Sequence, residues 1–217
     1  MIAGNQSNSR WQDILSLLLD RNFRGLWSAG LLQWTIFGIE ALATSIYIFS
    51  VTESPLLVTS LLAARMAPMI ILGSIVGALA ERLPGIILLS IGYLTLAIVF
   101  FVLGAIYLLG TIELWHIFLG ALFNGTGLTL DNTVRRKAIG ELAEGETLGT
   151  AMSLDISTLM LAMLLGPLVG GMIFEYTELS GAYFCIGGIF LIALVVVRTT
   201  TPVSYTHLRA HETSLHL

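Results

Sequence analysis

The sequence predicts an all-α, polytopic membrane protein in which six transmembrane helices form one bundle. Of its 217 residues, 56% are hydrophobic and only 11% are charged, whereas about 25% of the residues in an ordinary soluble domain are charged. The apolar residues also form runs long enough to span a bilayer. A helix needs about 20 such residues to span a hydrocarbon core of about 30 Å, where no water satisfies the backbone. A soluble globular protein is therefore excluded.

Six apolar runs are long enough to span. Three carry no charge, and three others qualify with one or two polar residues inside. They predict helices at about 26–50, 56–80, 85–109, 114–134, 150–174 and 179–197. The connections are short and contain turn residues, apart from the longer segment 135–147, so neighbouring helices should form antiparallel hairpins. We expect one bundle over 25–198, preceded by a segment 1–24.

The basic residues predict how the bundle is oriented. Eight of the ten fall on one side of the predicted spans and none on the other, and such residues are retained on the cytoplasmic side. These eight are Arg10, Arg21, Arg24, Arg82, Arg135, Arg136, Lys137 and Arg198. We therefore expect a multi-pass protein of the inner membrane with both termini in the cytoplasm. Within 1–24, the apolar residues Trp11, Leu15, Leu18 and Leu19 with the acidic Asp13 and Asp20 predict a short amphipathic helix on that surface.

Charge and cysteine content exclude several other classes. The net charge of −4 offers no basic surface for nucleic acid, so no nucleic-acid partner is expected. A single cysteine, Cys185, excludes an intramolecular disulfide framework. His207 and His211 have the i, i+4 spacing of metal ligands, but no third ligand follows a recognisable pattern. The sequence predicts neither a metal site nor a cofactor.

The last residues differ from the rest in composition. After Pro202 the chain turns polar and gains three of its four histidines, with no core-building pattern. Residues 203–213 resemble an in-frame translation of a transposase-type sequencing-library adapter. This resemblance predicts that 199–217 is a non-native or disordered tail, and that the natural gene was cut near Pro202.

Two charged residues lie in the middle of predicted spans. Glu40 is ten residues from the outer end of the first helix, and Arg65 is nine residues into the second, so both lie about 15 Å deep. Because charge at this depth costs a few kcal/mol, we expect the two side chains to pair beside a central cavity. A fixed structural pair with no role in transport is the alternative. Gln33 and Asn124 join them as candidates for a substrate or ion pathway, although polar side chains also bond helix to helix.

A second charged group is predicted at the cytoplasmic end. Asp131 precedes Arg135 by four residues, a favourable order for a helical ion pair, and Asp155 lies at a similar depth. With Glu81 and Arg82 they predict a cluster that closes the cytoplasmic mouth as a gate. The alternative is that the basic residues only fix orientation and the acids are their counter-ions.

Small residues form stripes on two helices. Without a hydrophobic drive between helices in lipid, such stripes permit close backbone approach. They are Gly73 and Gly77 in the second predicted helix, and Gly166, Gly170 and Gly171 in the fifth. Pro167 lacks a backbone donor and should kink the fifth helix. Static packing explains these residues more simply than a hinge does.

Three local patterns resemble one family. Leu-Leu-Asp-Arg-Asn-Phe-Arg-Gly-Leu-Trp (18–27) resembles the lead into helix 1 of major facilitator superfamily transporters. Gly-Ala-Leu-Ala-Glu-Arg (77–82) resembles their signature between helices 2 and 3, and Gly-Pro-Leu-Val-Gly-Gly (166–171) resembles the helix 5 signature of exporters. From about Leu17 to Val197 the chain is similar to the amino-terminal six-helix half of such a transporter, of the enterobactin-exporter and multidrug-efflux type.

The resemblance implies a bundle built as a three-plus-three inverted repeat. It also implies a secondary active exporter, an antiporter that moves a small amphipathic solute (drug or siderophore-like) across the bilayer by alternating access. Protons are the candidate coupling ion, and the missing carboxy-terminal half of the transporter is the expected partner. The arginine that many proton-coupled members carry in helix 4 would fall at Ala121, so the coupling ion does not follow from the resemblance.

Two other functions stay open at this point. A membrane-embedded enzyme is disfavoured, because neither Gly-x-Ser-x-Gly nor His-Glu-x-x-His occurs, and we expect the protein not to be an enzyme. A natural six-helix protein that dimerises into a transporter, or serves as an assembly subunit, requires the tail to be genuine.

Overall fold

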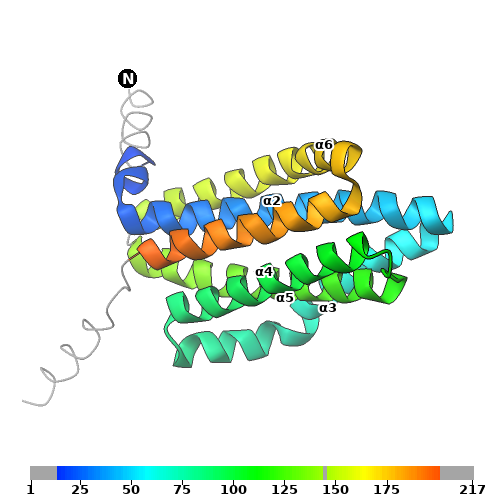
Figure 1. Ribbon diagram of the computed structural model, residues 1–217. Helices are drawn as coiled ribbons and strands as arrows, with labels where there is room; N and C mark the ends of the chain where they lie inside the picture. Colours follow the sequence, from blue (N-terminus) through cyan, green and yellow to red (C-terminus); the bar gives the residue numbers. More distant parts are fainter. Residues whose placement is uncertain (1–13, 144–145, 201–217) are drawn as a thin grey trace, which may run out of the picture.

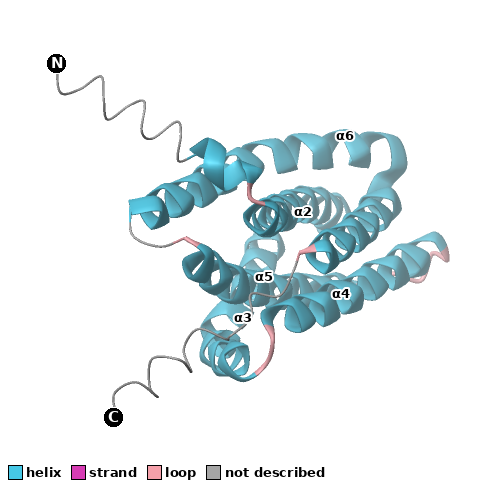
Figure 2. Cartoon of the chain, turned by 90° about the vertical axis from the view of Figure 1, so that its left-hand side faces the viewer, coloured by secondary structure: helices cyan, strands magenta, loops and turns pink. Residues whose placement is uncertain are grey.

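The computed structural model describes residues 14–143 and 146–200, and all regular structure in these residues is helical (Figures 1 and 2). A short helix at 14–19 precedes five longer elements: α2 (Arg21–Thr52), α3 (Pro55–Arg82), α4 (Gly85–Leu108), α5 (Leu114–Leu142) and α6 (Glu146–Thr199). The predicted all-α fold class is confirmed. The adapter-like residues 203–213 lie outside the described part of the chain.

Element α6 contains two spanning helices joined by a sharp turn. Glu178 has non-helical backbone angles, with φ at 56° and ψ at −156°, and there the chain reverses so that the two halves run antiparallel (Figure 1). The Glu178 carboxylate accepts a hydrogen bond of 2.7 Å from the Tyr107 hydroxyl at the end of α4. With α6 counted as two helices, the described residues form a bundle of six long helices.

Polar side chains lie inside the bundle and apolar side chains face outward, as expected of a protein in a lipid bilayer. Helices α2, α3, α4 and the stretch Thr147–Thr199 are long and apolar enough to span. Helix α5 is less apolar, because Asn124, Thr129 and Asp131 interrupt it, but all three are buried among the other helices. Large apolar side chains such as Ile70 face outward instead, with 84% of Ile70 exposed. Polar groups inside and apolar groups outside are what a bilayer demands.

Two helices are longer than the sequence predicts. Helix α2 begins at Arg21 rather than near residue 26, because the Asp20 carboxylate caps it by accepting from the Phe23 backbone N–H at 2.7 Å. Helix α5 continues to Leu142 rather than ending near residue 134. Arg135 and its two basic successors are therefore helical, not part of a connecting segment, since long unbranched basic side chains are good helix formers.

The predicted amphipathic helix is described only from residue 14 onward. Leu15 and Leu19 are exposed there, with 58% and 76% of their surface accessible, whereas Leu17 is buried against the bundle. This short helix ends at residue 19, and α2 begins at Arg21. Trp11 and Asp13 lie outside the described residues, and the position of this helix on the cytoplasmic surface stays a prediction.

Two close crossings hold the helices together. Where α2 crosses α6, a Cβ atom on Gly38 would lie only 2.8 Å from Cα of Gly166 and from Cδ of Pro167. Where α5 crosses α3, a Cβ on Gly125 would collide with the α3 backbone and lie 3.2 Å from Cγ of Pro68. At each crossing a glycine of one helix faces a helical turn of the other that contains a proline. The absence of a glycine side chain permits this close approach. Matching crossings of this kind are expected of an inverted three-helix repeat.

The two predicted glycine stripes have different surroundings. On α6, a Cβ on Gly170 would lie 2.8 Å from Cα of Ile39, and one on Gly171 would lie 3.2 Å from a leucine methyl carbon. On α3, no atom of another described helix lies within 4 Å of the Cβ position of Gly73 or Gly77. The close packing expected at these α3 glycines is therefore absent from the described part of the chain, although both glycines are partly buried.

The helix ends that carry the basic residues meet at one end of the bundle, on the left in Figure 1. Arg21 at the start of α2 donates to the Thr199 carbonyl at 2.7 Å. Lys137 near the end of α5 donates to the Ala80 carbonyl near the end of α3 at 3.0 Å. We call this the basic end of the bundle.

Candidate functional site

Four buried polar residues meet in the middle of the bundle. Arg65 Nε on α3 donates to Glu40 Oε2 on α2 at 2.5 Å, and Asn124 Nδ2 on α5 donates to the same oxygen at 3.1 Å. Arg65 Nη2 also donates to Thr44 Oγ1 at 3.2 Å. The pairing of Glu40 with Arg65 that their depth predicts is present. We call Glu40, Thr44, Arg65 and Asn124 the Glu40 cluster.

Helix geometry brings these side chains together. Glu40 and Thr44 are one turn apart on the same face of α2, and the Thr44 hydroxyl donates to the Glu40 carbonyl at 2.6 Å. The Arg65 guanidinium also lies 5.6 Å from the centre of the Phe37 ring, close enough for a cation–π contact. Next to Asn124, Gly125 lets α5 approach the α3 backbone. The cluster thus ties α2, α3 and α5 together.

Several polar atoms in or near the Glu40 cluster have no hydrogen-bond partner among the described residues. They include Glu40 Oε1, Asn124 Oδ1 and both amide atoms of Gln33. Gln33 is fully buried and lies seven residues before Glu40, on the same face of α2 and about 10 Å closer to the basic end. An unpaired buried polar group costs free energy. These atoms therefore have unused capacity for a polar ligand, a proton or water.

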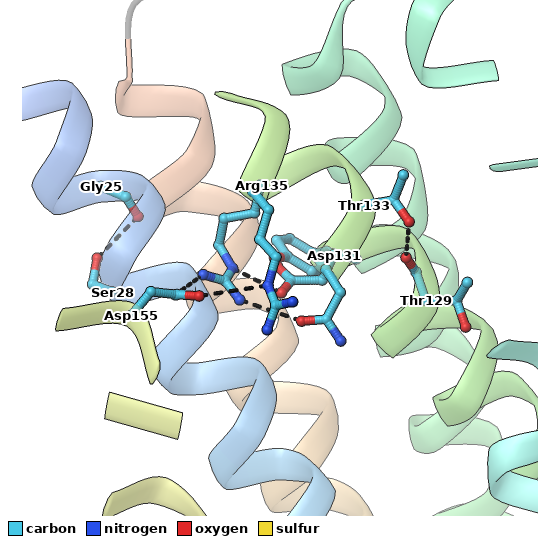
Figure 3. Close-up of polar contacts among 10 residues, drawn as sticks. Gly25, Ser28, Thr129, Asp131, Thr133, Arg135 and Asp155 are labelled. Atoms are coloured by element: carbon cyan, nitrogen blue, oxygen red, sulfur yellow. Dashed lines mark hydrogen bonds and ion pairs between the residues drawn. The ribbon is translucent and has the colours of Figure 1, made fainter. Parts of the chain in front are cut away.

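A second buried group lies nearer the basic end (Figure 3). Arg135 Nε on α5 donates to Asp131 Oδ2 at 2.9 Å, and Arg135 Nη1 donates to Asp155 Oδ1 on α6. The Tyr93 hydroxyl on α4 donates to the other Asp131 oxygen at 2.6 Å. We call Tyr93, Asp131, Arg135 and Asp155 the Arg135 cluster. It joins α4, α5 and α6, and both of its ion pairs are shielded from solvent.

Glu81 and Arg82 do not join this cluster, contrary to the sequence prediction. Both are exposed in the last turn of α3, and neither forms an ion pair with another described residue. The end of α3 is instead tied to α5 through Lys137 and the Ala80 carbonyl. Arg136, which is about half exposed, contributes a looser contact of 3.7 Å to Asp155.

Sequence reasoning missed two members of these clusters. Tyr93 lies in the charge-free third span, where only the need of a buried tyrosine hydroxyl for a partner signals its role. Thr44 is one turn beyond Glu40, and this spacing is a usable but weak signal. Within the described residues there is no group of three or more His, Cys, Asp or Glu side chains that could hold a metal ion.

Six lipid-facing helices around buried charged and polar groups define a multi-pass helical membrane protein. Residues 15–214, nearly the whole chain, match the Major Facilitator Superfamily. The chain therefore belongs to that superfamily, whose members are membrane transporters rather than enzymes. The matched range includes the adapter-like residues 203–213. No curated protein matches the chain.

Proposed function

We propose that the chain is one six-helix bundle of a secondary active exporter. It works by alternating access against a second bundle, the missing carboxy-terminal half of the same transporter. Support for a second bundle comes from the uncovered faces of α3 and the first half of α6. There no atom of another described helix lies within 4 Å of the Cβ position of Gly73 or Gly77, and α3 is the least buried of the long apolar helices.

The Glu40 cluster and Gln33 form the substrate or ion pathway in this proposal. The observation that carries it is the unused acceptor capacity of Glu40 Oε1 and Asn124 Oδ1 beside a fully buried ion pair. Ionisable groups inside a membrane mark ion and substrate pathways. The solute is a small amphipathic molecule of drug or siderophore type, and Glu40 is the group that would exchange a coupling proton in antiport.

The Arg135 cluster is the cytoplasmic gate in this proposal. Its ion pairs join α5 to α6 at the basic end, and the hydroxyl of Tyr93 adds α4. The excess of basic residues at that end supports its placement in the cytoplasm, with both termini on that side of the inner membrane. Opening the pathway to the cytoplasm would require Arg135 to release at least one of Asp131 and Asp155.

Efflux by the full-length transporter tests this function. Cells that express it are loaded with ethidium or a catecholate siderophore, and efflux is followed for E40Q and R65Q. Each substitution removes the charge of a group in the proposed pathway, so efflux by each variant should be slower by about tenfold or more. E175Q, which changes an exposed acid on α6, is the matched control and should leave efflux unchanged.

Two results would contradict parts of the proposal. Undiminished efflux by both E40Q and R65Q, with normal amounts of folded protein, would leave the Glu40 cluster as a structural ion pair. Efflux by the 217-residue chain alone would favour the half-transporter alternative, in which two copies complete the pathway.

A further inference from the structure

The guanidinium of Arg135 rests against bare backbone on α2. A Cβ atom on Gly30 would lie 2.5 Å from Arg135 Nε and 2.7 Å from Nη1, distances that no real side chain tolerates. Arg135 is fully buried at this position. The absence of a side chain at Gly30 therefore creates the space that the guanidinium occupies while it pairs with Asp131 and Asp155.

We propose that Gly30 is a positioning residue for the cytoplasmic gate. Because Gly30 has no side chain, it leaves a space on α2, here called the seat, that holds the Arg135 guanidinium in the closed arrangement. The inference rests on the proposed gate. The ion pairs and the Tyr93 hydroxyl alone connect α4, α5 and α6. The seat adds α2, which carries Glu40 ten residues, or about 15 Å, further along the same helix. Closure of the gate is thereby tied to the helix that forms the pathway.

The seat differs from the other glycine contacts of α2. A Cβ at Gly38 would meet Cα of Gly166 and the ring of Pro167, which are rigid parts of another helix. The three heavy atoms nearest to a Cβ at Gly30 all belong to the end of one flexible side chain, that of Arg135. An added methyl group at Gly38 should therefore strain the fold, whereas one at Gly30 should displace a charge. Displacement of Arg135 would leave buried carboxylates without their counter-ion.

The conformational test measures how fast a single thiol reacts with a maleimide in detergent-solubilised protein. In a C185A background, A151C reports on the basic end, because Ala151 is fully buried and lies one turn before Asp155 on α6. G30A should raise the rate about fivefold or more, within the usual range of coupling between sites. The rate at A182C should not change, because Ala182 is buried four residues past the Glu178 turn, at the end of the bundle opposite the basic end.

Two control variants accompany this measurement. G149A introduces the same methyl group on α6, where no atom of another described helix lies within 4 Å of its Cβ position. It should leave the A151C rate unchanged. D155N removes one gate ion pair and should raise the rate by itself. A rate that rises with D155N but not with G30A overturns the role of Gly30 alone. A rate that rises with neither overturns the gate as well.

A double-mutant cycle separates positioning from packing. In R135K the planar guanidinium is replaced by a smaller ammonium group. The lysine side chain therefore leaves room for a Cβ atom on Gly30. G30A should thus lower the midpoint of thermal unfolding less than half as much in the R135K background as with Arg135 present. G38A should lower it equally in both backgrounds. Equal losses from G30A in the two backgrounds would show that Gly30 only packs the helices, and would overturn the proposal.

Discussion

The two buried charge clusters use similar residues but differ in how completely their polar atoms are paired. In the Arg135 cluster the guanidinium bonds two carboxylates, and Asp131 also accepts from Tyr93. In the Glu40 cluster both donors converge on one carboxylate oxygen, and the other oxygen is left without a partner among the described residues. A fully paired network specifies one arrangement, whereas a partly paired one has capacity for another molecule. The first suits a gate and the second a pathway.

The largest expected effect comes from breaking the paired cluster. R135A removes the charge that both Asp131 and Asp155 depend on, so it should cost about 3–5 kcal/mol of stability. The measurement is thermal unfolding in detergent, together with the yield of monodisperse protein. The loss of stability comes from the two buried carboxylates that R135A leaves without a counter-ion. The triple variant R135A, D131N and D155N should therefore be more stable than R135A alone. A loss below about 1 kcal/mol for R135A would contradict the assignment, since that is the size expected of an exposed pair.

A smaller effect is expected from the hydroxyl that completes the same cluster. Y93F removes the donor to Asp131, a hydrogen bond to a charged group, and should cost about 1.5–3 kcal/mol. Unfolding of Y93F and wild type under the same conditions measures it. Y183F is the matched control, because the Tyr183 hydroxyl is buried without a partner among the described residues and its removal should cost much less. Equal losses would mean that pairing with Asp131 does not matter.

The smallest effect on stability is expected in the partly paired region. Q33L replaces an amide with no partner in the described part of the chain by an apolar group of similar size. It should change stability by less than about 1 kcal/mol, because no protein hydrogen bond is lost. Efflux of ethidium should nevertheless fall. A large loss of stability with unchanged efflux would reverse the roles given to the two clusters.

The depth of charged residues was predictable from the sequence, but their rotation about the helix axis was not. Counting from the helix ends placed Glu40 level with Arg65, and the four-residue spacing placed Asp131 beside Arg135. The same counting placed Glu81 and Arg82 near the gate, yet both point outward. In spans where nearly every residue is apolar, no polar face indicates which side of the helix is buried.

Contacts made by residues without charge also escaped prediction. Gly30, Gly38 and Gly125 matter because of atoms that another helix places opposite them. The extension of α5 beyond residue 134 depends on chain outside the apolar run, which hydropathy does not report. A sequence read alone thus gives the spans and the buried charges, while helix crossings require the folded structure.

The most direct test of the central claim, that the partly paired cluster forms the pathway, is ethidium efflux by the full-length transporter carrying both E40Q and R65Q. This double variant buries no unpaired charge, so it should fold with near-normal stability. The account predicts that such folded protein loses efflux. Efflux at the wild-type rate from the folded double variant would contradict it.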